Sequence, residues 1–138
     1  MLSKEEERIL IADNDEHVLI ALERSLEDGG YSTVTAVNHE EARKLLAEER
    51  FDLCVLDDCL SSDENSIEVL REFRDGCKRR LVIVTYHRFP LPREEKRFRA
   101  LGVSAFVNKR AHMELVDIVS YLLEPMTSRP QGAFDEMT

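Results

Sequence analysis

The chain has 138 residues, of which 43% are hydrophobic and 34% are charged. This length fits one domain with a single core, and no apolar run approaches the ~20 residues that a membrane span requires. The formal net charge of −9 argues against nucleic acid binding by bulk attraction, because neutralising phosphates needs a concentrated basic face.

The N-terminus, MLSKEEERIL, is charged where a signal peptide would be apolar, so we expect a cytoplasmic protein. The three cysteines, Cys54, Cys59 and Cys77, have no Cys-x-x-Cys spacing and are odd in number. Neither a disulfide framework nor a zinc site is indicated, and we expect free thiols.

Five short segments rich in β-branched and aliphatic residues predict strands that are buried on both faces. In chain order these segments are 8–12, 32–37, 51–57, 80–86 and 104–109. Each strand is followed by a helical pattern, so the predicted order is a strand and a helix, five times.

The predicted helices show apolar residues at helical spacing. Asn38 is the expected N-cap of the second helix, with Glu41 at its third position. Segment 93–102 predicts a short fourth helix that ends at Gly102. The apolar positions of the other four are Leu19, Leu22 and Leu26; Ala42, Leu45 and Leu46; Ile67, Leu70 and Phe73; and Leu115, Ile118 or Val119, and Leu122.

Strict alternation of strands and helices predicts an α/β fold, a doubly wound parallel sheet with right-handed crossovers. No glycine-rich phosphate loop follows the first strand, which disfavours a dinucleotide-binding domain. We expect the domain to span 8–124, with 125–138 as a flexible tail or the start of a linker, because that segment contains two prolines and little periodicity.

Polar residues stand at four of the predicted strand ends: Asp13, Asp57, Thr85 and Lys109. In open parallel sheets, ligands bind beyond the carboxyl ends of the strands. Two carboxylates ~5 Å apart repel by about 3 kcal/mol at an effective dielectric near 20, and a cation relieves this repulsion. Oxygen ligands favour Mg²⁺, while a lysine and a hydroxyl suit phosphoryl oxygens. Asp57 is then a candidate nucleophile.

The segments ILIADNDE, FDLCVLD, LVIVT and GVSAFVNK, in this order, resemble the receiver domain of two-component response regulators across 8–124. The resemblance implies a flavodoxin-like three-layer sandwich with strand order 2-1-3-4-5. It also implies transfer of a phosphoryl group from a histidine kinase or phosphotransfer protein to Asp57. Such a domain is a phosphoryl acceptor rather than a turnover enzyme, and whether it dephosphorylates itself is left open.

The resemblance also implies a role for each site residue. The implied Mg²⁺ ligands are Asp13, Asn14, Asp57 and the backbone carbonyl of Cys59. Lys109 would pair with the phosphoryl group.

Thr85 and Phe106 would switch the face formed by the last two helices and the strand between them. A downstream protein would bind at this face, and pairing with a second copy of the chain is left open.

Among the departures from the family pattern, two concern the proposed site directly. The family has two adjacent acids after the first strand, whereas this chain has Asp13 followed by Asn14, so the formal charge of the three-residue site falls from −3 to −2. Weaker Mg²⁺ binding is therefore expected. Tyr86 replaces a small residue after Thr85 and could screen the phosphoryl pocket.

Two other functions are weighed against phosphorylation. A pseudo-receiver would use the same fold as a protein-interaction module without phosphorylation. A phosphatase of the haloacid dehalogenase type would need a second acid two residues after its nucleophile, where this chain has Cys59.

The basic run around the fourth helix is either a solvated face or a docking patch for an acidic partner. Its members are Arg88, Arg93, Lys96, Arg97 and Arg99.

Overall fold

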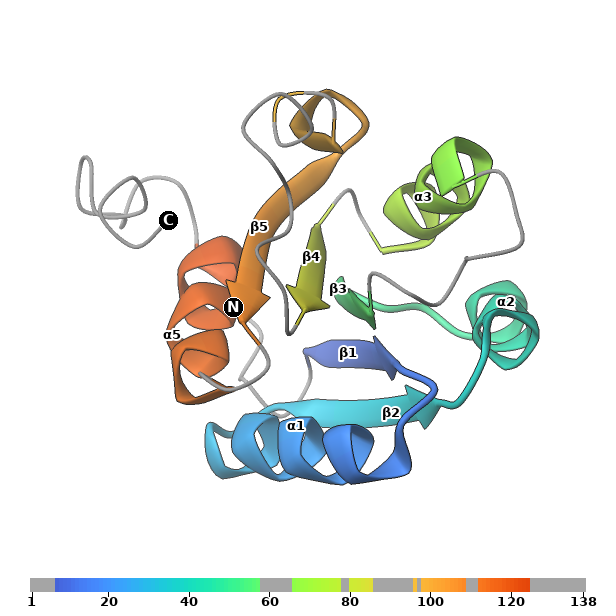
Figure 1. Ribbon diagram of the computed structural model, residues 1–138. Coiled ribbons are helices and arrows are strands. Elements are labelled where there is room, and N and C mark those ends of the chain that lie inside the picture. The colour runs from blue at the N-terminus through green and yellow to red at the C-terminus, as the bar shows by residue number, and fades with distance from the viewer. Residues whose placement is uncertain are drawn as a thin grey trace.

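The protein is a five-stranded parallel sheet with helices on both faces, which confirms the predicted fold (Figure 1). The structure, a computed structural model, describes residues 7–57, 66–77, 80–85, 96, 98–108 and 112–124. Its strands run in the order β2-β1-β3-β4-β5. They are β1 (Arg8–Ala12), β2 (Ser32–Ala36), β3 (Leu53–Asp57), β4 (Leu81–Thr85) and β5 (Val103–Asn108).

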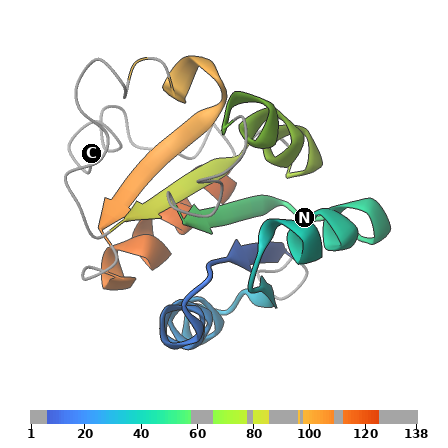
Figure 2. The ribbon, with the colours of Figure 1, turned by 45° about the vertical axis from the view of Figure 1, so that its right-hand side comes forward.

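The helices form the two outer layers. They are α1 (Glu16–Asp28), α2 (His39–Glu48), α3 (Ser66–Gly76) and α5 (His112–Leu123). Helices α1 and α5 cover one face of the sheet, and α2 and α3 cover the other (Figures 1 and 2). Of the predicted fourth helix, residues 96 and 98–100 are helical, and the other positions of 93–100 lie outside the described residues.

Each sheet face has its own hydrophobic core. Leu19, Leu22 and Leu26 of α1 pack with Leu115, Ile118 and Leu122 of α5, as the helical spacing predicts. On the opposite face, Ala42 of α2 and Phe73 of α3 are fully buried. The central strand β3 is buried along its whole length, because it is covered from both sides.

Side-chain caps fix the starts of two helices. The carboxamide of Asn38 accepts a hydrogen bond from the backbone N–H of Glu41 at 2.8 Å, which confirms the predicted cap of α2. Asp15 caps α1 in the same way, through the backbone N–H of His17 at 2.9 Å. Each cap satisfies a backbone donor that the first helical turn leaves without an intrahelical partner.

The third strand begins at Leu53, two residues later than predicted. Asp52 is engaged differently from a ladder residue: its carboxylate accepts a hydrogen bond from the backbone N–H of Arg8 at 2.9 Å. Its own N–H donates to the carbonyl of Arg8 at 2.8 Å. Through these two hydrogen bonds, Asp52 holds the backbone of Arg8 at the start of β1, and it precedes β3 instead of forming part of it.

Strand β5 contains an irregularity that the sequence did not predict. Leu81 of β4 pairs with Val103, but the next residue, Val82, pairs with Ala105. Ser104 is thus one extra residue in β5, which is the signature of a β-bulge. Beyond it, Ala105 packs on the α1 and α5 side of the sheet, and Phe106 on the α2 and α3 side.

Gly102 ends the helical turn before β5, as predicted. Its φ of +107° lies in the region that favours glycine. A side chain at this position would also collide with that of Arg74, which extends from α3. The turn before β5 therefore depends on glycine for both backbone conformation and space.

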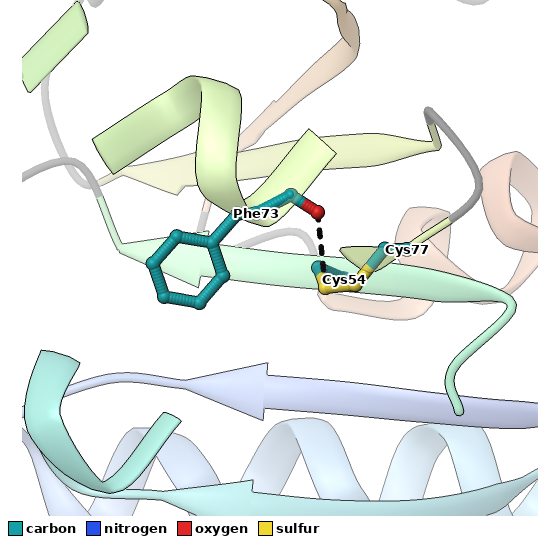
Figure 3. The surroundings of a disulfide bond; sticks show 3 residues. All are labelled: Cys54, Phe73 and Cys77. Atoms are coloured by element: carbon teal, nitrogen blue, oxygen red, sulfur yellow. Dashed lines mark hydrogen bonds between the residues drawn. A yellow bond between two sulfur atoms is a disulfide. The ribbon is translucent and has the colours of Figure 1, made fainter. Parts of the chain in front are cut away.

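Cys54 and Cys77 form a disulfide, so the prediction that all three cysteines are free thiols is wrong for this pair (Figure 3). Both residues are fully buried, and their Cα atoms are 5.7 Å apart, within the usual range for disulfides. The bond links β3 to the residue that follows α3, with a sequence separation of 23 residues. Cys59 lies outside the described residues.

Tyr31 is a buried polar side chain that ties the start of β2 to α5. Its hydroxyl lies 2.8 Å from Oγ of Ser120, a hydrogen-bond distance. Burial raises the pKa of the Tyr31 phenol above its ordinary value of 10.0, partly opposed by the hydrogen bond to Ser120. Glu7 and Glu124 also raise this pKa, because their negative charges disfavour a phenolate.

This shift predicts alkaline sensitivity. Because the folded-state pKa is higher than the unfolded-state pKa, the contribution of neutral Tyr31 is fully present below about pH 10 and is lost as the pH rises toward the folded-state value. We expect Tyr31→Phe to lose stability less steeply than the wild type between about pH 9 and about pH 11 in urea unfolding. Ser120→Ala keeps the titrating phenol and should retain the steep loss. Parallel pH profiles for wild type and Tyr31→Phe would contradict this prediction.

Candidate functional site

Two carboxylates lie side by side at the carboxyl edge of the sheet. Ala12 of β1 pairs with Leu56 of β3, and Asp13 and Asp57 are the residues that follow this pair. Neighbouring parallel strands are about 4.8 Å apart, so the two acids lie close together. Asp13 is 0% exposed and Asp57 is 6% exposed. Buried carboxylates at adjacent strand ends are costly without charge compensation.

The loop from β1 to α1 holds Asp13 in place. Its N–H donates to the carbonyl of Ala36 at 3.1 Å, which continues the β1–β2 pairing. Its Oδ1 accepts a hydrogen bond from the N–H of Asp15 at 2.9 Å. Asp15, which also caps α1, thus connects the helix start to the acidic site. Asp15 is not among the predicted site residues, although an aspartate before an amphipathic helix is a recognisable N-cap signal.

The donor set suits Mg²⁺. Proteins bind this ion through one or two carboxylates and leave its other positions to water and phosphate oxygens. Asp13 and Asp57 provide two carboxylates, and the buried atoms Asp13 Oδ2 and Asp57 Oδ1 accept no hydrogen bond from the part of the chain that the structure describes. Within the described ranges, no group of three histidine, cysteine or acidic side chains is placed to hold a metal ion. A site formed by the protein alone, as for structural zinc, is therefore not seen in this part of the chain.

The structure describes some of the other predicted site residues and not the rest. Asn14 is exposed at the surface beside Asp13. Thr85 ends β4, with Asn108 of β5 as its partner, but its side chain lies outside the described part of the structure. Phe106 is half-buried on β5. Cys59, Tyr86 and Lys109 lie outside the described residues.

The described helices include none that is long and apolar enough to cross a membrane.

The order of the strands defines a flavodoxin-like α/β domain, with a buried acidic pair at the carboxyl edge of its sheet, where ligands of such folds bind. The model of the response regulator receiver domain family matches residues 9–120, and the chain belongs to this family. Receiver domains are signalling modules of two-component systems rather than turnover enzymes.

Solved receiver structures share this fold. A two-component response regulator from Clostridium difficile superposes with a TM-score of 0.73 at 22% identity, covering 90% of this chain and 100% of that one. The response regulator TrrA from Thermotoga maritima, solved in complex with Mg²⁺ and BeF, gives a TM-score of 0.68 at 27% identity. That match covers 85% of this chain and 99% of TrrA.

Among curated proteins, the chain is similar to the alginate biosynthesis transcriptional regulatory protein AlgB from Pseudomonas aeruginosa. The two are 41% identical over 86 residues, which is 62% of this chain and 19% of AlgB. The match thus spans about a fifth of that relative's length. The prediction that the chain binds no nucleic acid stays a prediction.

Proposed function

We propose that this chain accepts a phosphoryl group on Asp57 from a histidine kinase or phosphotransfer protein. The observation that supports the proposal best is the buried pair Asp13 and Asp57 at adjacent strand ends, in a chain of the receiver family. Of the two, Asp57 is the nucleophile and Asp13 a metal ligand, as the resemblance implies.

The reaction is a phosphoryl transfer between two side chains. A carboxylate oxygen of Asp57 forms a bond to phosphorus while the phosphorus–nitrogen bond to the donor histidine breaks, and the imidazole leaves with the electron pair and takes up a proton. Bound Mg²⁺ supplies compensation for the negative charge of carboxylates and phosphoryl oxygens. Asp13, Asn14, Asp57 and the carbonyl of Cys59 would hold it.

Two further residues would act on the phosphoryl oxygens. Lys109 would pair with them as a cation, and the hydroxyl of Thr85 would donate a hydrogen bond. The movement of Thr85 would be coupled to Phe106, and together they would change the face made by β5, α5 and the preceding helix. A downstream protein or a second copy of the chain would bind to this face.

A pseudo-receiver is the second candidate, and Asn14 is the observation that favours it. This residue is exposed and uncharged where the family has a second acid, so the site has one formal negative charge fewer for Mg²⁺. In that case, the output face would bind its partner without modification of Asp57.

Intact-mass spectrometry tests the proposal directly. We expect a single phosphoryl adduct after incubation with acetyl phosphate and Mg²⁺, and none when Mg²⁺ is removed with a chelator. Asp57→Asn should abolish the adduct, because the amide is not a nucleophile. Asp75→Asn is the matched control: it makes the same change at an exposed acid of α3 and should leave the adduct in place.

Two outcomes of this measurement would contradict the proposal. If folded wild-type protein gains no adduct from acetyl phosphate or from phosphorylated donor kinases, the pseudo-receiver is favoured. If Asp57→Asn still gains the adduct, Asp57 is not the acceptor.

A further inference from the structure

Arg99 makes two contacts across the turn that leads into β5. Its Nη1 donates a hydrogen bond to the backbone carbonyl of Ser104 at 2.9 Å. Its guanidinium carbon also lies 5.5 Å from the centroid of the Phe106 ring, within the range of a cation–π contact. One side chain therefore connects the end of the preceding helix to both the backbone and a side chain of β5.

The carbonyl that Arg99 binds belongs to the extra residue of the β-bulge. Ser104 has no partner in the β4–β5 register, since Val103 pairs with Leu81 and Ala105 with Val82. A bulge interrupts the regular ladder and changes the direction of the side chains that follow. The hydrogen bond from Arg99 thus holds the point at which Phe106 is directed toward the α2 and α3 side of the sheet.

Phe106 has an aromatic neighbour, Phe98, in the helical turn that also carries Arg99. Its ring and that of Phe98 are 6.5 Å apart with an interplanar angle of 72°, an edge-to-face arrangement. Phe106 is half-buried and packs against the core on this face. Phe98 and Arg99 together hold a ring that is neither fully buried nor fully exposed.

We propose that Arg99 is a positioning residue that holds Phe106 in its half-buried place and so sets the resting position of the output face. Lys96 of the same basic run is exposed, as a solvated face would be, whereas Arg99 is half-buried and engaged with β5. The regulatory meaning rests on the proposed function, in which Phe106 moves with Thr85. The effect of Arg99 on the ring in the unmodified protein does not depend on it.

The chain contains no tryptophan, so Phe106→Trp creates a single tryptophan reporter, whose emission can be excited selectively over that of the three tyrosines. Loss of an exposed cation–π contact changes an equilibrium about two- to fivefold. We therefore expect Arg99→Ala in this reporter background to increase acrylamide quenching and to shift the emission to longer wavelength. Arg99→Lys keeps a cation and should give an intermediate result.

Two comparisons separate positioning from a general loss of structure. Arg43→Ala removes an exposed arginine from α2, where it pairs with Glu72, and should leave the quenching unchanged. If Arg99→Ala does not fold, Arg99→Gln keeps a donor for the Ser104 carbonyl, removes the cation, and is expected to increase quenching. Equal quenching in the folded reporter with and without Arg99 would overturn the proposal.

These measurements are made before any phosphoryl donor is added. An unreactive Asp57, seen by mass spectrometry, would remove the proposed function and leave the effect of Arg99 on Phe106 intact. An unchanged reporter in a protein whose Asp57 does accept phosphate would remove only the role of Arg99.

Discussion

Reduction of the Cys54–Cys77 disulfide is expected to lower the free energy of unfolding substantially. The bond closes a loop with a sequence separation of 23 residues, which contains Asp57 and α3. In the chain-entropy model, a cross-link over such a loop stabilises the native state by roughly 3 kcal/mol, because it restricts the unfolded chain. For a domain of this size, the loss corresponds to a decrease of about 10 °C in the melting temperature.

Urea unfolding with and without a thiol reductant measures this effect. The double variant Cys54→Ala and Cys77→Ala should be insensitive to the reductant, whereas Cys59→Ser should keep the full dependence. Thiol labelling of denatured protein gives an independent count: of the three cysteines, one should react before reduction and three after it. Three reactive thiols without reductant would show that the bond is not formed, and an unchanged unfolding energy after confirmed reduction would show that it adds no stability.

The two redox states have different contacts at the same place. The Sγ atom of Cys54 lies 4.0 Å from the carbonyl oxygen of Phe73, so a reduced thiol at this position has an acceptor in α3 (Figure 3). A reducing cytosol opposes stable disulfides. The expectation of a cytoplasmic protein therefore conflicts with the presence of this bond. A thiol count on freshly isolated protein measures whether Cys54 and Cys77 are oxidised or reduced.

Local patterns predicted the fold well because they act within one element. Leu19, Leu22 and Leu26 repeat at the spacing of one helix face, and the cap at Asn38 needs only the next three residues. Alternation of strands and helices then restricts the topology to few arrangements, and in all of them strand-end residues such as Asp13 and Asp57 meet at one edge.

The features that were missed depend on pairing between distant segments. The bulge at Ser104 exists only in relation to the register of β4, and nothing in the sequence of β5 requires it. The bond between Cys54 and Cys77 requires that the end of α3 returns to the start of β3, which cysteine spacing alone does not reveal. Arg99 belongs to a basic run, and only the bulge carbonyl and Phe106 show what it contacts.

Asn14→Asp is expected to increase Mg²⁺ affinity by about tenfold or more. Two unit charges 4 Å apart interact by ~1 kcal/mol in water, so a dication beside one added carboxylate gains about 2 kcal/mol before side-chain ordering is counted. The substitution changes neither the size of the side chain nor its exposed position next to Asp13. Isothermal titration calorimetry with MgCl₂ measures the affinity, and the Mg²⁺-dependent rise in melting temperature provides a second measure.

Asn38→Asp separates site-specific affinity from net charge. It makes the same chemical change at an exposed residue, and aspartate remains a good N-cap for α2. The control should bind Mg²⁺ with nearly wild-type affinity, since Asn38 caps α2 and is not one of the predicted metal ligands. If both variants gain affinity equally, Asn14 is not part of the metal site. If Asn14→Asp alone gains, and acetyl phosphate also modifies it faster than the wild type, then the missing acid limits phosphorylation of Asp57.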